Sequence, residues 1–408
     1  MKVIMRSAIR LIAWLAVCLP VLVSAQIDPI KRDYLQLGYD QPVEGHAPLS
    51  AYAFYYHNDP DFIGTNITLR LALAPVYLDS ELGFVHLLGP QTDFAIGLAG
   101  GGFAGDYNEI RGGKWIQGES FDGSGGEISS SIYHLFNPKD EIPLNFMLRG
   151  TAHYAAYDSN NHTAANFQVP ENGEVYSVRT GLRFGGIEPT LFPDLAMELS
   201  VWYEGQYRSD SGGYGFDDDR RLNSSTHLFW SSAALDYTLP QSKQSFSLQI
   251  IGGTSINPDR LSAYRLGGYL PLAAEYPLSL PGYYYQEFSA RQFVLINANY
   301  ILPLVRDQQW NLFFNGATAD IDYLTGTEGP GQSAGDWVSG VGAGILYRSP
   351  SKRLKVMLSY SYGIDAIRMG GRGGNSIGLL FQYNLEKPHG SDSGPVRHWP
   401  VWGSLWGF

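Results

Sequence analysis

Side chains that could support catalysis are few in this chain. The sequence holds nine histidines, scattered along the chain. Hydrolysis by a serine requires an imidazole beside the hydroxyl, so that the ring can take its proton. His153 and Ser200 fall on the polar faces of their predicted strands, and no predicted strand offers serine and histidine at neighbouring outward, apolar-face sites. We therefore predict no catalytic residue.

Metal ligands are equally sparse. The scattered histidines form no cluster, and the only cysteine is Cys18. The stretch GGYGFDD, residues 212–218, partly matches a calcium-binding nonapeptide repeat, but it occurs once and Asp219 stands where an apolar residue is needed. We predict a solvated acidic loop there, with neither a metal site nor a cofactor.

The first 25 residues have the pattern of a secretory signal peptide. Lys2, Arg6 and Arg10 precede a short apolar run, and a small-residue cleavage site ends at Ala25. Cys18 lies inside this segment. We therefore expect an exported chain that has no thiol and no disulfide.

The composition is typical of an outer-membrane β-barrel. Glycine (48), tyrosine (27), phenylalanine (20) and tryptophan (9) are abundant, while charged residues make up only 16%. No apolar run of about 18 residues follows the first segment, so a membrane helix is not expected. Strands of such barrels alternate between lipid-facing and lumen-facing residues, which hides their hydrophobicity from a sliding window. The net charge of −11 argues against nucleic acid as a partner.

Period-two alternation marks the strands. In RLKVMLSYSYG, Leu354, Val356 and Leu358 share one face, while Arg353 and Lys355 share the other. Similar runs are long enough to cross a bilayer at a tilt, which takes about 10 residues, whereas strands of soluble sandwiches are shorter. The runs therefore favour a membrane barrel with a polar lumen over a secreted soluble β-protein.

Fifteen candidate strands are recognisable, and the glycine-rich stretch 105–125 could hold another. Their predicted bounds are 49–58, 65–75, 78–88, 92–104, 126–136, 144–157, 174–186, 193–208, 224–239, 244–255, 287–302, 308–323, 335–348, 353–364 and 375–386. Single-chain bacterial barrels have even strand numbers, so we predict an all-β fold, a transmembrane antiparallel β-barrel of about sixteen strands, with fourteen as the alternative. The predicted organisation is a signal peptide (1–25), a short periplasmic N-terminal segment (26–48), the barrel (49–386) and a tryptophan-rich C-terminal tail (387–408).

The last predicted strand carries an assembly signal. Its sequence SIGLLFQY resembles the signal by which outer-membrane barrels present their closing strand to the assembly machinery, carried here by Ser376, Gly378, Phe381 and Tyr383. A bare backbone at the glycine and lipid-facing aromatic anchors suit pairing at a strand edge. The expected partners are therefore that machinery and outer-membrane lipid.

A long predicted loop, 257–288, separates the last five strands from the rest. Its YRLGGY stretch, with Leu266, Gly267 and Gly268, and the five strands after it resemble the bacterial surface antigen superfamily. That family includes the outer-membrane insertases and the two-partner-secretion transporters. The resemblance covers residues 244–386 and is to the barrel alone. It implies that the loop folds back into the lumen.

The loop tip partly follows the family pattern. LPGYYY keeps Gly282 and Tyr283 but has Pro281 where the family usually has arginine. The resemblance implies that Arg265 lies in the lumen near acidic wall residues such as Glu198 or Glu204. Alternating glycines on one later strand are expected to leave room for the inward loop, at Gly340, Gly342 and Gly344.

The predicted function is non-enzymatic passage or insertion of a polypeptide or lipid at the outer membrane of a Gram-negative-type bacterium. The cargo is unknown from the sequence. A passive diffusion porin, with loop 257–288 as its constriction, is the alternative, and an outer-membrane lipid hydrolase is the second alternative. Channel recordings distinguish the first two, because a nearly closed pore that opens on deletion of 257–288 would favour the first.

Overall fold

The computed structural model describes most of the chain. The described residues are 30–102, 105–140, 142–304, 309–329, 332, 335–368 and 371–386. The predicted signal peptide and the predicted tryptophan-rich tail lie outside them.

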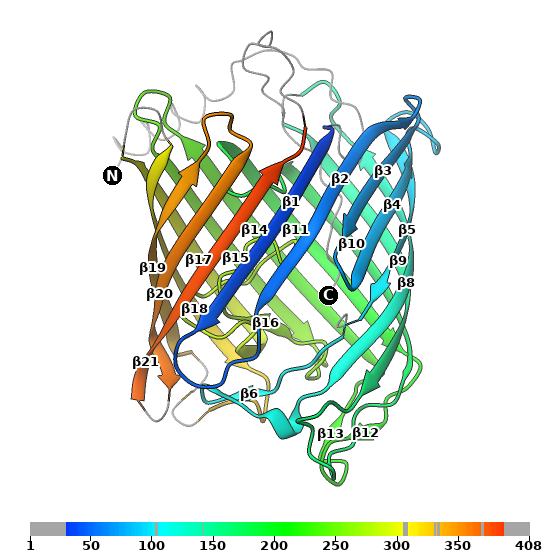
Figure 1. Ribbon diagram of the computed structural model, residues 1–408. Helices are drawn as coiled ribbons and strands as arrows, with labels where there is room; N and C mark the ends of the chain where they lie inside the picture. Colours follow the sequence, from blue (N-terminus) through cyan, green and yellow to red (C-terminus); the bar gives the residue numbers. More distant parts are fainter. Residues whose placement is uncertain are drawn as a thin grey trace, which may run out of the picture.

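The described residues form a closed, antiparallel, sixteen-stranded β-barrel (Figure 1). The wall strands are β1 (Arg32–Pro42), β2 (Ala51–Ile63), β3 (Ile67–Leu73), β4 (Tyr77–Phe84), β5 (Thr92–Gly101), β8 (Asp122–Leu135), β9 (Leu144–Asp158), β10 (Gly173–Gly186), β11 (Leu195–Arg208), β14 (Ser225–Thr238), β15 (Ser245–Ile256), β17 (Phe288–Pro303), β18 (Trp310–Tyr323), β19 (Trp337–Arg348), β20 (Leu354–Arg368) and β21 (Gly371–Asn384). The barrel closes where β1 pairs with β21, from Tyr34 opposite Asn384 to Pro42 opposite Ser376. We call this pairing the seam.

Short elements occupy the connections. The short strand β16 (Tyr264–Leu266) pairs with the beginning of β17. Two hairpins, β6–β7 (Ile110–Arg111, Lys114–Trp115) and β12–β13 (Gly213–Tyr214, Arg220–Arg221), lie in loops. The 3₁₀ helix η1 (Gln117–Glu119) has three residues. None of the described helical segments could span a bilayer.

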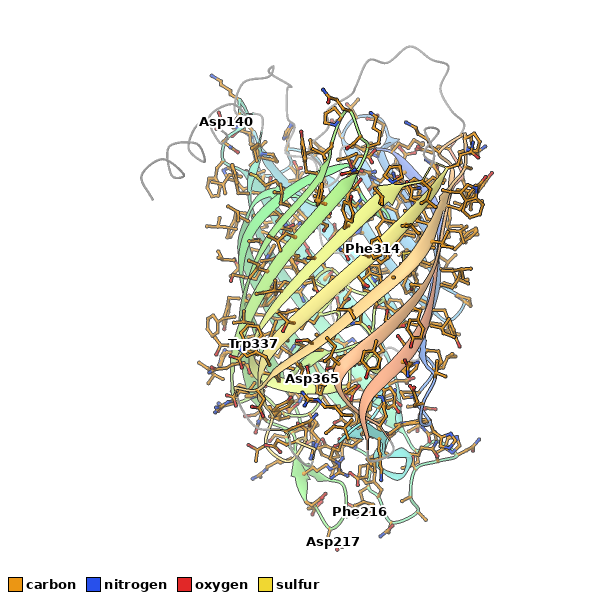
Figure 2. The ribbon with its side chains drawn as sticks, turned by 90° about the vertical axis from the view of Figure 1, so that its left-hand side faces the viewer. Asp140, Phe216, Asp217, Phe314, Trp337 and Asp365 are labelled. Carbon is orange, nitrogen blue, oxygen red and sulfur yellow. The ribbon has the colours of Figure 1, made fainter. Side chains whose placement is uncertain are left out.

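Alternation places apolar side chains outside and mixed side chains inside the wall. Leu358 and Ile377 are 60% and 52% exposed on the outer face, whereas the neighbouring Met357 and Leu380 point inward and are buried. Figure 2 shows Phe314 on the outer wall and Trp337 near one rim, which matches an apolar band with aromatic residues at its edge. The predicted transmembrane barrel is confirmed.

A charge on this outer face is expected to be costly. Leu358→Arg should lower the free energy of unfolding by about 2–4 kcal/mol, because a guanidinium near the bilayer midplane loses its hydration. Leu49→Arg, in the connection between β1 and β2, is the matched control and should cost about 1 kcal/mol or less. Urea unfolding in lipid vesicles measures both. Equal costs would contradict the membrane-facing assignment of Leu358.

One predicted boundary was wrong. All fifteen candidate strands are present, but the sixteenth strand is β1 rather than the stretch 105–125, which holds β6, β7 and the beginning of β8. Residues 32–42 therefore belong to the barrel and not to a periplasmic segment. The physical reason is that β21 needs a partner to close the barrel, and β1 provides it over nine paired positions.

The two ends of the barrel differ. Both chain ends of the wall, Arg32 and Asn384, lie at one rim, which is at the top of Figure 1. We call this the terminal end, and its connections are mostly short. The opposite loop end carries the long connections, at 102–121, 159–172, 209–224, 257–287 and 324–336. Outer-membrane barrels have this asymmetry, with short periplasmic turns and long extracellular loops.

Candidate functional site

The candidate site is the connection between β15 and β17, residues 257–287, which we call the luminal loop. It starts and ends at the loop end and folds back inside the wall (Figure 1). Leu266, Leu280 and Tyr283 are fully buried in a cluster with inward-facing wall residues. The wall members of that cluster include Leu295, Ala317, Ala319 and Val338. The loop therefore fills the lumen at this level.

The Leu-Gly-Gly element forms the turn that admits the loop. Gly267 and Gly268 have φ values of 136° and 68°, a region that favours glycine. A Cβ on Gly267 would lie 2.2 Å from the carbonyl oxygen of Tyr284. The Tyr269 amide then donates to the carboxylate of Asp40 on β1 at 2.6 Å, so the turn is tied to the seam.

The loop tip sits on a row of wall glycines. Gly340, Gly363 and Gly374 are register partners on β19, β20 and β21. A Cβ on Gly340 would lie 2.0 Å from the Pro281 carbonyl oxygen, and Cβ atoms on the other two would lie 2.9 and 3.0 Å from the Gly282 carbonyl oxygen. The close approach of the tip backbone to the wall therefore depends on glycine.

The other two predicted glycines, Gly342 and Gly344, are surrounded by wall atoms and not by the loop. Added Cβ atoms on Gly342 and Gly344 would meet wall atoms, nearest the Asn315 Oδ1 at 2.2 Å and the Leu358 carbonyl oxygen at 2.4 Å. Among the three predicted positions, Gly340 is the one that touches the loop. Tyr283 donates its hydroxyl to the Ser339 carbonyl oxygen at 3.1 Å beside it.

Arg265 does not lie where the resemblance implied. Its guanidinium donates to the Gln286 carbonyl oxygen at 2.8 Å and to the Asn108 carbonyl oxygen at 2.9 Å. It also lies 5.0 Å from the ring centre of Tyr107. It thus braces the loop entrance and does not pair with Glu198 or Glu204, so that expectation was wrong.

The charge pairing between loop and wall is the reverse of the expected one. Glu275 of the loop binds Arg179 and Arg183 of β10, with the Arg179 contact at 3.4 Å. The same two arginines also pair with Glu204 at 2.6 Å and Glu198 at 3.5 Å on β11. Each arginine is thus shared between one wall carboxylate and the loop carboxylate, in a buried setting where charged hydrogen bonds are strong.

An aromatic contact reinforces this anchor. The Tyr276 hydroxyl accepts from Arg183 at 2.6 Å, and its ring lies 6.0 Å from those of Trp202 and Trp230. Arg183 lies 5.1 Å from the Trp202 ring centre, within cation–π range. Sequence analysis missed this anchor, because neither Glu275 nor Tyr276 stands in a recognisable motif.

Removing the anchor carboxylate is expected to loosen the loop. Glu275→Ala leaves Arg179 and Arg183 with one carboxylate each and should destabilise loop docking by about 2 kcal/mol, the scale of a hydrogen bond to a charged group. Hydrogen exchange of residues 268–284 measures the effect, and it should rise without faster exchange in β10 or β11. Glu171→Ala, at an exposed position between β9 and β10, is the control. Unchanged loop protection in Glu275→Ala would contradict the anchor.

A second ion pair fixes the end of the loop. Arg368, at the end of β20, binds both carboxylate oxygens of Glu287 at 2.8 and 2.7 Å, and both side chains are buried. Its guanidinium lies 3.8 Å from the Tyr284 ring centre. Tyr284 in turn donates to the Glu44 carbonyl oxygen at 3.0 Å, between β1 and β2. These contacts join the end of the loop to β20 and to the β1–β2 connection.

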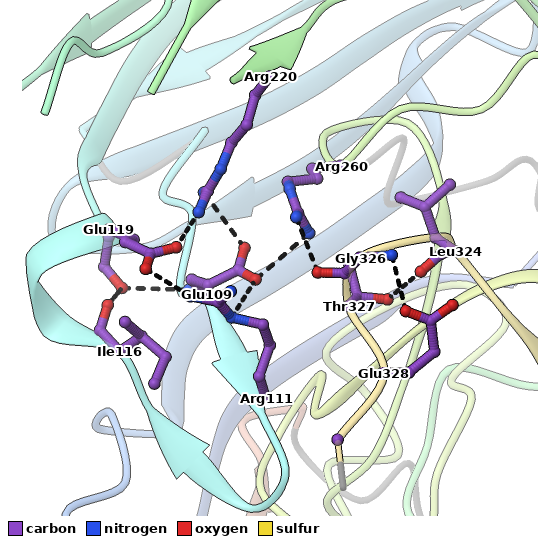
Figure 3. Close-up of polar contacts among 12 residues, drawn as sticks. Glu109, Arg111, Ile116, Glu119, Arg220, Arg260, Leu324, Gly326, Thr327 and Glu328 are labelled. Carbon is purple, nitrogen blue, oxygen red and sulfur yellow. Dashed lines mark hydrogen bonds and ion pairs between the residues drawn. The ribbon is translucent and has the colours of Figure 1, made fainter. Parts of the chain in front are cut away.

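Loops at the loop end form a cap over the lumen. Its hub is Glu109, which is fully buried and accepts from the Tyr107 hydroxyl at 2.5 Å. Arg111, Arg220 and Arg260 reach the same carboxylate at 3.2, 3.5 and 3.3 Å (Figure 3). Three long connections, from β5, β11 and β15, are therefore held together by one carboxylate.

A second carboxylate completes the cap. Glu119 binds Arg111 and Arg220, and Arg260 donates to the Gly326 carbonyl oxygen at 2.9 Å (Figure 3). Burial lowers the pKa of Arg220, which Glu109 only partly offsets. Burial opposes the charge of Arg260 as well, but Glu109 and nearby tyrosines leave its pKa raised. Beyond this network Asp217 and Asp218 are exposed at the tip of the β12–β13 hairpin (Figure 2).

A second connection enters the lumen from the terminal end. Residues 187–194, which join β10 to β11, are called the terminal-end turn here. Leu191 is buried against inward-facing wall residues of β17–β21, and Tyr269 and Leu272 of the luminal loop pack on the same cluster. The wall members are Ile301, Phe313, Leu346, Met357 and Leu380. The lumen is therefore occupied from both ends, and the two segments meet.

The closing-strand residues alternate as expected. Ser376 and Gly378 face inward, and Ser376 is fully buried. Phe381 and Tyr383 are on the outer face and pair across the seam with Leu37 and Leu35. Their role in assembly remains a prediction.

Two outward histidines correct the catalytic analysis. His227 shares the outer face of β14 with Ser225, so the statement that no strand offers such neighbours was wrong. The His227 Nδ1 instead lies 3.0 Å from the Tyr203 hydroxyl, and the His134 Nδ1 lies 2.8 Å from the Thr92 hydroxyl. Neither contact pairs histidine with serine.

The barrel is similar to solved outer-membrane proteins. Superposition on CdiB from Acinetobacter baumannii gives a TM-score of 0.56 at 9% identity, covering 87% of this chain and 60% of that chain. CdiB from Escherichia coli gives 0.55 at 8% identity, with 87% and 63% covered. BamA from Haemophilus ducreyi lacking POTRA domains 1–3 gives 0.51 at 10% identity, with 86% and 71% covered.

The chain has the fold of these barrels. It spans about three fifths of the length of the CdiB chains. No protein-family model matches the sequence, and no curated protein matches it by sequence. These likenesses show the barrel fold, which is thus confirmed.

Proposed function

We propose that this barrel passes or inserts a polypeptide at the outer membrane, without enzymatic activity. The observation that carries the proposal is the luminal loop, whose Gly267–Gly268 turn admits it and whose tip rests on the glycine row of β19–β21. A segment held inside a wide barrel by discrete contacts can move without unfolding the wall. A lipid cargo is the alternative within the same function.

Two further observations support this choice. The barrel fold is similar to those of CdiB and BamA, and the Leu-Gly-Gly element followed by five strands resembles their superfamily. A passive porin of sixteen strands would keep an aqueous channel, whereas here both ends contribute segments to the lumen. In this proposal the terminal end faces the periplasm, the cap faces outside, and the assembly machinery and outer-membrane lipid are the partners.

The test locks the loop to the wall in living cells. Asp40→Cys and Tyr269→Cys, in a background with Cys18→Ser, place two thiols where the Tyr269 amide contacts the Asp40 carboxylate. A bifunctional methanethiosulfonate reagent joins them, and a reductant releases them. The surface and secreted polypeptides of cells lacking the gene, with wild-type protein and with the locked protein are compared by mass spectrometry.

The expected result is a polypeptide that is lost without the gene, restored by wild type, lost again on cross-linking and restored on reduction. The single-cysteine variants, treated in the same way, are the controls. Unchanged exported polypeptides together with lost uptake of a small solute would overturn the proposal in favour of a porin. A change confined to surface lipid would overturn the polypeptide cargo.

A further inference from the structure

The terminal-end turn crosses the lumen and docks on the seam. It leaves the wall between β10 and β11, yet residues 189–192 make polar contacts to β1, β20 and β21 on another part of the wall. A connection at the short-turn end of a barrel has no need to enter the lumen. We therefore expect the contacts that hold the turn in the lumen to have a function.

Two buried glutamines of the seam bind the main chain of the turn. Gln36 and Gln382 are register partners on β1 and β21, and Gln36 donates to Gln382 at 2.9 Å. Gln36 also donates to the Pro189 carbonyl oxygen at 3.0 Å, and Gln382 accepts from the Leu191 amide at 2.8 Å. The Gln382 amide further donates to the Thr190 hydroxyl at 2.7 Å. Both glutamines are more than nine-tenths buried.

A lysine adds a charge to the same site. The Lys355 Nζ on β20 lies 2.5 Å from the Leu191 carbonyl oxygen and 3.5 Å from the Phe192 carbonyl oxygen. It also lies 3.3 Å from the Thr190 hydroxyl. The carbonyl oxygens around the ammonium take the place of its water shell. Contacts to main-chain carbonyls do not depend on which side chains the bound segment carries.

One side-chain pocket accompanies the main-chain contacts. Leu191 fills the apolar cluster of the wall, and the Phe192 ring lies 5.3 Å from that of Phe313. Phe192 has a φ of 52°, a left-handed conformation that is unfavourable for a residue with a side chain. Docking therefore holds the turn in a strained shape, which would relax on release.

This arrangement has the contacts of a peptide-binding site, and the terminal-end turn itself occupies it. Main-chain contacts give affinity for a segment that takes up the bend of the turn, in which the Thr190 amide donates to the Glu188 carbonyl oxygen at 2.8 Å. One apolar pocket gives a preference for a side chain. If the turn left, Gln36, Gln382 and Lys355 would lose buried partners, which is unfavourable unless another chain restores them. The luminal loop touches the same cluster through Tyr269 and Leu272, so an incoming segment would also disturb the loop.

We propose that this seam site binds a short bent segment of the transported polypeptide, with an aliphatic side chain in the Leu191 pocket, and that the terminal-end turn is its built-in competitor. The inference rests on the proposed function and names the site where the cargo enters. The ligand class is an unstructured peptide that presents main-chain carbonyls and one apolar residue.

The test vacates the site and offers a peptide copy of the turn. In the glycine variant two glycines replace residues 188–193, which removes the main-chain groups that contact Gln36, Gln382 and Lys355. The probe is a fluorescein-labelled, end-blocked peptide with the sequence of residues 188–193, EPTLFP, and binding to folded protein in detergent is followed by anisotropy. The glycine variant should bind at least about tenfold more tightly than wild type, the change expected for one charged hydrogen bond or more.

Matched substitutions identify the contacts. Adding Lys355→Met or Gln382→Leu to the glycine variant should weaken peptide binding about tenfold. Lys352→Met, an exposed lysine in the neighbouring β19–β20 turn, should leave it unchanged. The same peptide with aspartate in place of leucine should bind more weakly.

A second readout keeps the wild-type turn and does not depend on the glycine variant. A Leu191→Cys variant with Cys18→Ser should react slowly with a maleimide, and saturating EPTLFP should speed the reaction. The proposal fails if folded glycine variant binds no peptide and the peptide leaves Cys labelling unchanged. It also fails if binding persists in full with Lys355→Met and Gln382→Leu together. The binding test uses no cargo. If the peptide does not bind but the export test succeeds, only the seam site is wrong. If the peptide binds but export does not depend on the protein, the proposed function is wrong.

Discussion

Replacing the luminal loop alone should leave the barrel nearly closed, whereas replacing it together with the terminal-end turn should open it. In the first variant a short glycine–serine linker replaces residues 268–284. In the second, two glycines also replace residues 188–193. Single-channel recordings in planar bilayers should show a conductance about tenfold higher for the combined variant than for the loop variant, since an unplugged sixteen-stranded barrel leaves an aqueous channel.

The reason is that the two segments close the lumen at different levels. The loop tip packs on the glycine row and on β17–β19 near the loop end, while Leu191 packs on Phe313, Met357 and Leu380 nearer the terminal end. The terminal-end turn keeps its bonds to Gln36, Gln382 and Lys355 when the loop is gone. Sequence analysis gave pore opening on deletion of 257–288 as the outcome that favours the first function over a porin, and it did not identify residues 187–194 as a luminal segment.

The control replaces an equivalent turn that stays outside the lumen. Residues 240–243, between β14 and β15 at the same end, are all exposed, and replacing them with two glycines should leave the conductance unchanged. A full opening by the loop variant alone would show that the terminal-end turn is no barrier. A closed combined variant would show that the cap and wall side chains suffice to block the lumen.

The strand pattern could be predicted because the bilayer imposes it. Strong alternation marked fifteen of the wall strands, and the same signal is present in β1, where Leu35, Leu37 and Tyr39 alternate with Gln36 and Gly38. Sequence analysis instead names the glycine-rich stretch 105–125 as the place that could hold a further strand. Alternation marks a strand but not its partner, so the strand that closes the barrel follows only from the geometry of closure.

The luminal contacts could be predicted only in part. Glycines that the backbone itself requires, such as Gly267 and Gly282, stood out in the sequence. The ion pairs did not, because Glu275 meets Arg179 and Arg183 from a loop distant in the chain, and no spacing rule links them. Arg368 is a similar case, because a charged residue at a strand end is expected to be solvated, and the sequence does not show that it pairs with Glu287 of the loop in a buried position.

Gly282→Ala should release the loop tip while leaving the wall folded. Gly282 has a φ of 82°, which costs a residue with a Cβ about 1–2 kcal/mol. Its added Cβ would also lie 2.0 Å from the Gly363 amide nitrogen, and backbone cannot give way as a flexible side chain can. Overpacking of this kind adds about 1–3 kcal/mol, so docking of the tip should weaken by roughly 3 kcal/mol in total.

A second glycine separates the two causes. Gly64, in the turn between β2 and β3, has a φ of 63°, but a Cβ there would meet no atom within 4 Å. Gly64→Ala should therefore show the conformational cost alone, about 1–2 kcal/mol in urea unfolding, with no change in luminal-loop protection. Gly282→Ala should raise hydrogen exchange across residues 278–286 and leave exchange in β19 and β20 unchanged. If both variants behaved alike, the tip would not be seated on the wall glycines, and the luminal loop would lose the contact on which its proposed movement depends.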